Sequence, residues 1–180
     1  GTSLLTRSPA RFAFLFLLSV PVWWLFEFLN GIVQNWHYLG GEYFGAWSGV
    51  VATIHFSTVI PAVFETTELI ASFEWTRRFA QYRKTIVTPR LTLVTFVLGW
   101  VGLLALIVGP STAYPLVWLS VLMICDPVNA WLGRPSLLRH IQQGNWRVPI
   151  VLAAAGLVCG GFWEMWNFWS MPKWLYTVPH

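Results

Sequence analysis

Long apolar stretches separated by short polar connections constrain this chain more than any other feature of its sequence. Five such stretches lie at about residues 12–33, 47–71, 91–109, 114–132 and 148–170. An α-helix needs about 20 mostly apolar residues to cross ~30 Å of hydrocarbon. Only 10% of the 180 residues are charged, whereas a soluble domain carries about 25%. We therefore expect an all-α, polytopic membrane helix bundle that forms a single membrane domain over 1–180, and we exclude a soluble enzyme or a nucleic-acid-binding protein.

The basic residues predict the direction of these spans. With five alternating spans, ten of the eleven Lys and Arg residues fall on one side of the membrane, in the segments around 7–11, 77–90 and 134–147, and only Lys173 falls on the other. Connections rich in Lys and Arg stay in the cytoplasm. We therefore expect a multi-pass protein of a bacterial inner membrane with a cytoplasmic N-terminus. The cluster at 77–90 also suits contact with anionic lipid or a partner.

Five acidic residues lie inside the apolar stretches: Glu27, Glu65, Glu68, Asp126 and Glu164. An ionisable side chain near the centre of a membrane helix costs at least ~2.5–3.5 kcal/mol and usually faces the bundle interior. Each has a polar neighbour three residues away, on the same helix face, in the pairs Glu27–Asn30, Glu65–Glu68, Asp126–Asn129 and Glu164–Asn167. The five carboxyl groups are the candidate catalytic residues. The structural alternative is that they form hydrogen bonds between helices.

One pattern occurs twice: Glu-x-x-Asn near the end of a span, then Trp-x-Tyr six or seven residues later. The first copy contains Glu27, Asn30, Trp36 and Tyr38, and the second contains Glu164, Asn167, Trp174 and Tyr176. Repeated segments in membrane proteins often share a site at their interface. The pattern predicts an internal repeat of spans one and five, with one site formed by both glutamates.

The remaining candidate ligand-binding residues are polar or aromatic side chains near these carboxyl groups. They are Asn30, Asn129, Asn167, Trp24, Trp163, Trp166 and His55. Since the four histidines show no paired spacing, no metal site is expected, and the lone His55 suits packing as well as ligand binding.

Small residues indicate where helices approach one another closely. Gly156 and Gly160 in span five, and Gly99 and Gly102 in span three, are spaced by three or four residues. Such pairs let helix backbones come together in lipid, so we expect both pairs to lie at helix–helix contacts.

The Trp-x-Tyr segment at 36–38, followed by a span with Pro61, Glu65 and Glu68, resembles the small integral-membrane carotenoid cyclases of the lycopene cyclase type. The resemblance covers residues 27–70 and part of 164–180. In that family two adjacent glutamates follow the proline, whereas here they are three residues apart. The resemblance implies a membrane enzyme that cyclises an isoprenoid, with Glu65 and Glu68 as acids. The chain also resembles uncharacterised bacterial multi-span proteins, which imply no function.

The sequence leaves several functions open. A neutral buried carboxylic acid can protonate an isoprenoid, and Trp faces stabilise the resulting cation, so one hypothesis is an enzyme or binding protein for an isoprenoid, carotenoid or lipid. The bound group would be a carotenoid, another pigment, a quinone or a lipid. A second hypothesis is an accessory transmembrane subunit of a photosynthetic or respiratory complex. A transporter is less favoured, because no span is clearly broken.

The second copy of the repeat ends near His180, without the Pro- and Glu-containing span that follows the first. A buried Glu164 needs partners to remain in the bilayer. We therefore expect a sixth helix, from sequence after His180 or from another subunit.

Overall fold

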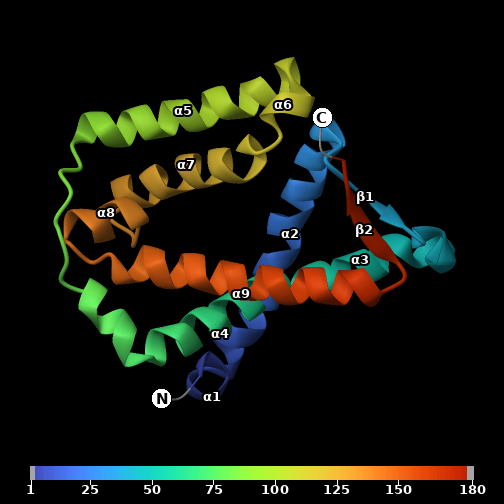
Figure 1. The fold of residues 1–180 in the computed structure, drawn as a ribbon, viewed down its shortest axis with the longest axis horizontal. Coiled ribbons are helices and arrows are strands. Elements are labelled where there is room, and N and C mark those ends of the chain that lie inside the picture. Colours follow the sequence, from blue (N-terminus) through green and yellow to red (C-terminus); the bar gives the residue numbers. More distant parts are fainter. Residues whose placement is uncertain (1–2, 178–180) are drawn as a thin grey trace. The chain divides into compact units, whose positions relative to one another are not determined.

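The structure is a computed structural model that describes residues 3–177, and it is almost entirely helical (Figure 1). In chain order the helices are α1 (Leu4–Arg7), α2 (Pro9–Val33), η1 (Gly41–Trp47), α3 (Ser48–Ser57), α4 (Val59–Ser72), η2 (Glu74–Phe79), α5 (Pro89–Val108), α6 (Pro110–Ala113), α7 (Leu116–Trp131), α8 (Leu137–Gln142) and α9 (Arg147–Trp169). The strands are β1 (Trp36–Leu39) and β2 (Lys173–Tyr176), which form a two-stranded antiparallel sheet. The prediction of a helical fold is confirmed, but that prediction did not include the two-stranded sheet. The expected sixth helix after His180 lies outside the described residues.

Four helical segments within residues 3–177 are long and apolar enough to cross a membrane: Pro9–Val33, Gly41–Ser72, Pro89–Val108 and Arg147–Trp169. The predicted span at 114–132 corresponds to α7, which is apolar but has only 16 residues. Pro110 is the first residue of the short helix α6, and Pro115 lies between α6 and α7, where a proline cannot donate a helical backbone hydrogen bond. The count of five spans stays a prediction.

The described chain forms two compact units. The first unit contains residues 3–28, 36–73 and 151–177, and the second contains 29–35 and 74–150. The single membrane domain expected over 1–180 stays a prediction.

In the first unit, the helix expected over 47–71 is broken at Thr58, between α3 and α4. The Ser19 hydroxyl of α2 donates a hydrogen bond to the Phe56 carbonyl and accepts one from the Ile60 N–H at 3.1 Å. In an unbroken helix, the Ile60 N–H would bond directly to the Phe56 carbonyl. Ser19 is 1% exposed. A side chain from a neighbouring helix therefore interrupts the backbone ladder locally at Thr58, within a segment that is otherwise helical from Gly41 to Ser72; the expectation that no span is clearly broken stays a prediction.

Helices α4 and α9 form the buried apolar contact of the first unit. Ile70 of α4 packs with Val151 and Ala155 of α9, and all three side chains are buried. Farther along, the Cys159 thiol donates to the Thr66 hydroxyl at 3.4 Å. These contacts join span two to span five along one side of α9.

In the second unit, α5 and α7 lie side by side in antiparallel directions (Figure 1). A Cβ added at Gly102 would lie 2.2 Å from the Ser120 Oγ, and one at Gly99 would lie 2.7 Å from the Ile124 Cγ1. At Gly99 an added Cβ would also lie 3.0 Å from the Ser120 carbonyl oxygen, so that position requires glycine, whereas at Gly102 the Ser120 hydroxyl would have to rotate. Both positions confirm the expected close contact. In α9, by contrast, a Cβ at Gly156 or Gly160 would meet no atom within 4 Å. Residues 3–177 do not form the helix contact expected there.

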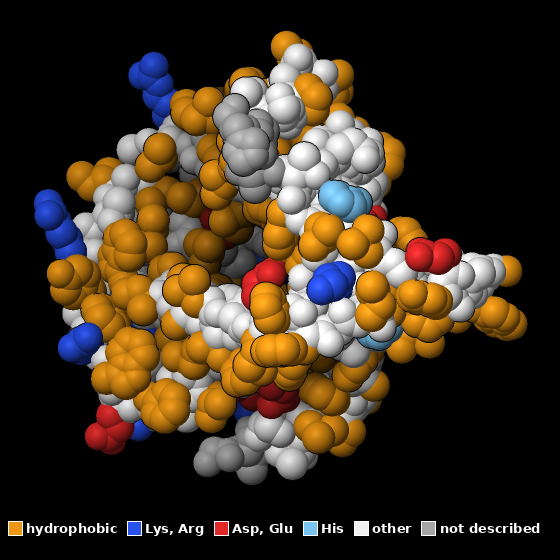
Figure 2. Space-filling model, turned by 45° about the vertical axis from the view of Figure 1, so that its right-hand side comes forward, with side chains coloured by type: hydrophobic (Ala, Val, Ile, Leu, Met, Phe, Trp, Pro, Cys, Tyr) orange, Lys and Arg blue, Asp and Glu red, His pale blue; other side chains and the backbone are white. Residues whose placement is uncertain are grey.

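Apolar side chains are widely exposed. Figure 2 shows hydrophobic side chains over most of one face, with charged side chains at scattered positions. Leu17, Leu157 and Val108 on three of the long helices are 70%, 79% and 88% exposed. Large exposed apolar areas indicate a membrane or partner environment, which agrees with a membrane protein.

Candidate functional site

The first copy of the repeated pattern surrounds Glu27, near the end of α2. The Glu27 Oε1 atom accepts hydrogen bonds from the Trp23 Nε1–H at 3.2 Å, the Trp36 Nε1–H at 3.1 Å and the Tyr38 hydroxyl at 2.5 Å. Trp23 precedes Glu27 by one helical turn, whereas Trp36 and Tyr38 belong to β1. Three aromatic donors therefore converge on one carboxyl oxygen.

The second copy surrounds Glu164, near the end of α9, in the same way. The Glu164 Oε1 atom accepts hydrogen bonds from the Trp174 Nε1–H at 3.3 Å and the Tyr176 hydroxyl at 2.6 Å. Trp174 and Tyr176 belong to β2. In both copies, the Trp and Tyr side chains of a strand bind the glutamate of the helix that precedes it.

The two asparagines turn the chain from helix to strand. The Asn30 Oδ1 accepts a bond from the Asn35 N–H at 3.0 Å. The Asn167 side chain accepts from the Trp174 N–H at 2.8 Å and donates to the Trp174 carbonyl at 2.9 Å. Gln34, between helix and strand, has a positive φ of 53°, a conformation that is uncommon outside glycine. These contacts give Asn30 and Asn167 a structural role, and their predicted ligand binding stays a prediction.

Sheet pairing joins the two copies (Figure 1). Trp36 lies opposite Tyr176, and Tyr38 lies opposite Trp174. Because side chains alternate along a strand, these four aromatic residues share one face of the sheet. His37 and Leu175 share the other face, where the Thr177 hydroxyl lies 3.5 Å from the His37 Nδ1. We call the group of Glu27, Glu164, Trp36, Tyr38, Trp174 and Tyr176 the aromatic–carboxylate site.

Gly40 permits a close approach between the connection after β1 and the connection before β2, at the end of the sheet where Leu39 pairs with Lys173. Its φ is +80°, and an added Cβ would lie 3.0 Å from the Met171 Sδ and 3.2 Å from the Pro172 Cα. Glycine adopts this left-handed conformation without a steric cost. Any larger residue would push the connection after β1 away from the one before β2.

The two tyrosine hydroxyls have perturbed acidity. About half of each side chain is exposed, but burial around the hydroxyl, with the bond to Glu27, raises the pKa of Tyr38 above its ordinary value. Burial and the bond to Glu164 raise the pKa of Tyr176 to about 12. Both phenols therefore remain protonated donors at neutral pH.

Glu65 and Glu68 on α4 contact the N-terminal segment instead. The Glu68 carboxylate accepts the Leu4 N–H at 3.1 Å and forms an ion pair with Arg7. The Glu65 Oε1 accepts the Leu5 N–H at 3.4 Å. The i, i+3 spacing therefore directs both glutamates to α1. These contacts give them a structural role, and their predicted catalytic role stays a prediction.

Asp126 belongs to the second unit and binds the start of α8. Its two oxygens accept the Leu137 N–H at 2.5 Å and the Leu138 N–H at 3.0 Å. Asp126 is buried, whereas Asn129 is exposed, so the expected polar pair does not share one environment. Their predicted catalytic and ligand-binding roles stay predictions.

The predicted aromatic residues lie in different surroundings. The Trp24 Nε1–H donates to the Thr53 hydroxyl at 3.1 Å, and its ring meets Phe56 edge-on at 5.3 Å. Trp163 is half-buried, and Trp166 is 60% exposed. His55 is exposed on α3. None of these four donates a hydrogen bond to Glu27 or Glu164 among the described residues.

The donors that do contact the glutamates are Trp23, Trp36, Tyr38, Trp174 and Tyr176, which the candidate list lacked. The repeated Trp-x-Tyr pattern was the signal that could have included four of them. Within residues 3–177, no three His, Cys, Asp or Glu side chains come together to hold a metal ion. Comparisons with protein-family models, curated proteins and solved structures gave no match to this chain.

Proposed function

We propose that the protein is an integral membrane protein that binds a lipid- or isoprenoid-type ligand at the aromatic–carboxylate site. The observation that carries this proposal is the matching arrangement of Glu27 and Glu164, each held by Trp and Tyr donors from paired strands. The sheet joins the two arrangements at the ends of two long apolar helices. A ligand that binds the site through its polar group would therefore place its apolar chain along α2 or α9.

The composition of the site favours an amphipathic ligand. Ligand sites combine a mainly apolar lining with a few fixed polar groups that orient the ligand. Here the polar groups are two carboxyl groups, each fixed through its Oε1 atom. The partly exposed rings of Trp174, Tyr38 and Tyr176 supply apolar surface beside them. A ligand with a hydroxyl or amine end fits best, because it donates a hydrogen bond to a carboxyl oxygen.

The repeat and the membrane orientation belong to the same proposal. The two copies are repeats of one helix–strand unit, and their strands pair with each other to form the sheet. The N-terminus lies in the cytoplasm, with five spans if α7 crosses the membrane. The Arg7–Glu68 ion pair supports this orientation, because it joins the N-terminal segment to the end of α4, which leads into the basic connection at 77–90.

A second candidate function is that of an accessory transmembrane subunit. It is favoured by the exposed aromatic end of α9, where Phe168 and Trp169 are 68% and 82% exposed. A neighbouring subunit would cover these side chains and supply the expected sixth helix. In that case the protein purified from its native membrane contains a second polypeptide at a constant molar ratio to this chain.

Farnesol, an isoprenoid alcohol, tests the first proposal as a probe. Farnesol is titrated into the wild type, the Glu27→Gln and Glu164→Gln variants, and the control Glu42→Gln, whose side chain is exposed. Binding is followed by Trp fluorescence. Loss of a hydrogen bond to a charged group costs about 1.5–3 kcal/mol, so we expect roughly tenfold or greater weakening in the two site variants alone. Equal affinity in all four proteins would contradict the proposal.

A further inference from the structure

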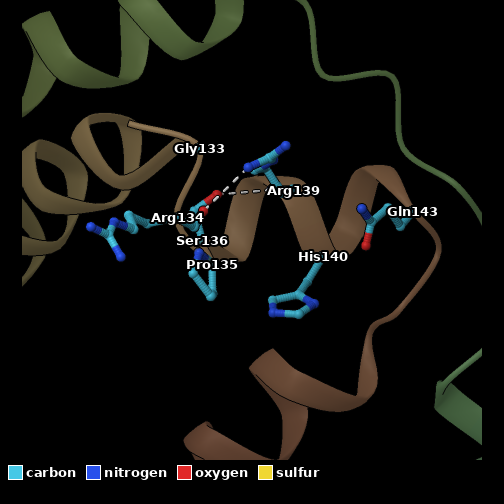
Figure 3. Close-up of a pocket in the computed structure, with 7 residues that line it drawn as sticks. All are labelled: Gly133, Arg134, Pro135, Ser136, Arg139, His140 and Gln143. Atoms are coloured by element: carbon cyan, nitrogen blue, oxygen red, sulfur yellow. Dashed lines mark hydrogen bonds between the residues drawn. The ribbon is translucent and has the colours of Figure 1, made fainter. Parts of the chain in front are cut away.

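A second, separate feature lies in the second unit, where two cavities flank α8. The first, of about 300 Å³, is lined by α8 and by the segment that leads into it, with Arg134, Ser136, Arg139 and His140 among its residues (Figure 3). The second, of about 270 Å³, has a mainly apolar lining that includes Val87, Pro89, Ala130, Trp131 and Leu138. Arg139 lines both cavities. Both cavities are open surface hollows, one lined mostly by polar residue types and the other mostly by apolar residue types, and they share this one arginine.

The position of these cavities is fixed by the antiparallel pair of α5 and α7. The start of α5, at Pro89, and the end of α7, at Trp131, lie at the same end of the pair and both line the apolar cavity. The cavities thus lie where apolar helices give way to polar connections. At this depth a membrane changes from acyl chains to headgroups.

The walls of the cavities are held by hydrogen bonds. The Ser136 hydroxyl accepts the Arg139 N–H at 3.2 Å and caps α8, and Arg139 also reaches the Arg134 carbonyl at 3.5 Å (Figure 3). The Gln142 amide donates to the Val87 carbonyl at 3.3 Å. These bonds fix the start of α8 and its contact with the segment that leads into α5.

The charge around α8 is positive. Segment 74–150 contains eight Lys and Arg residues against two acidic ones, Glu74 and Asp126. Asp126 is buried against the start of α8, with both oxygens bonded to backbone N–H groups. Glu74 lies 3.5 Å from Arg77. Both carboxylates are therefore occupied, whereas Arg134 and Arg139 are exposed at the polar cavity.

We propose that these two cavities form a binding site for an anionic phospholipid. The phosphate binds at Arg139, which lines both cavities, Arg134 adds positive charge at the first cavity, and the start of an acyl chain lies against Trp131 and Leu138. Basic pockets beside membrane helices bind the headgroups of anionic lipids in this manner. The apolar cavity favours a phospholipid over a soluble anion, because a soluble anion would use only the arginines.

Native mass spectrometry of the intact protein tests this proposal. The protein is released from nanodiscs of equal phosphatidylglycerol and phosphatidylcholine content, and the retained lipids are counted. We expect preferential retention of phosphatidylglycerol and about tenfold lower retention in the Arg134→Gln/Arg139→Gln variant. The matched control is Arg77→Gln/Arg78→Gln, which removes the same charge from η2 and should retain lipid as the wild type does.

Two further variants separate folding from binding. Arg134→Gln alone leaves the contact between Arg139 and the Arg134 carbonyl in place, since that contact uses the backbone, and should still lower retention several-fold. Ala130→Trp fills the apolar cavity with all arginines present and should also lower it. Equal losses in the Arg77→Gln/Arg78→Gln control would overturn the proposal in favour of a diffuse basic surface. Complete displacement of the lipid by millimolar inorganic phosphate would overturn it in favour of a soluble-anion site.

Discussion

Trp36 lies directly opposite Tyr176 in the two-stranded sheet, and each donates a hydrogen bond to the glutamate of a different helix. The pair therefore connects Glu27 on α2 with Glu164 on α9 through neighbouring side chains. Aromatic cross-strand pairs stabilise a sheet by roughly 0.2–1 kcal/mol each. Since an isolated two-stranded sheet is marginally stable, the bonds to the glutamates help to hold it. Sheet and site depend on each other.

Removal of the Tyr38 hydroxyl tests this dependence. Tyr38→Phe keeps the ring but loses the bond to Glu27, so we expect unfolding to require about 1 kcal/mol less free energy. Unfolding by SDS titration in mixed micelles gives this difference. The control Tyr43→Phe removes a hydroxyl from a side chain that is 71% exposed on η1 and should have no effect. Equal losses in the two variants would mean that the Glu27 bond adds no stability.

The raised pKa of Tyr176 predicts an effect of alkaline pH. A folded-state pKa of about 12, against about 10 in an unfolded chain, stabilises the protonated phenol in the folded state. This stability is complete below pH ~10 and is lost as the pH rises from 10 towards 12. The tyrosinate absorbance difference between the wild type and Tyr176→Phe reports this group. We expect a midpoint near pH 12, and a midpoint near 10 would contradict the hydrogen bond to Glu164.

The break in span two depends on Ser19. Ser19→Ala leaves the Phe56 carbonyl and the Ile60 N–H without the hydroxyl that bridges them. If α3 and α4 stay separate, the two unsatisfied groups lower the free energy of unfolding by about 1–3 kcal/mol each. If α3 and α4 join into one straight helix, the ends of that helix move apart. Spin labels at residues 50 and 69 distinguish these results by their distance. Ser72→Ala, which loses only a local bond to the Leu69 carbonyl, is the control. An unchanged distance together with unchanged stability would show that Ser19 does not maintain the break.

Gly102 sets the separation of α5 and α7. Because an added Cβ would collide with Ser120, Gly102→Ala should destabilise the protein by about 1–3 kcal/mol. Gly156→Ala is the matched control, since no atom lies within 4 Å of its Cβ position; it should be neutral or slightly stabilising. Both values come from the same SDS titration. A neutral Gly102→Ala would show that the contact with the Ser120 hydroxyl does not limit the separation of the helices.

The sequence predicted the helices well, because span length and apolar character are local properties. The sheet was not predictable in this way. Its strands are four residues long and are held by partners far apart in the chain, so the repeated Trp-x-Tyr pattern marks both segments without indicating that they pair.

The roles of the other acidic residues were also hidden from the sequence. Asp126, Glu65 and Glu68 accept backbone N–H groups from short helices. Backbone donors are present at every residue except proline and leave no pattern to recognise. Ser19 was missed for a related reason, since a single serine in an apolar helix gives no sign that it inserts into a neighbouring helix.

The central claim is that Glu27 and Glu164 form one ligand site, and a double-mutant cycle with farnesol tests it most directly. Affinity is measured in the wild type, Glu27→Gln, Glu164→Gln and the double variant, with the stoichiometry taken from saturation. We predict one farnesol per chain and non-additive losses, with a coupling free energy of at least about 0.5 kcal/mol. Two farnesol molecules per chain, or losses that add within experimental error, would contradict a shared site.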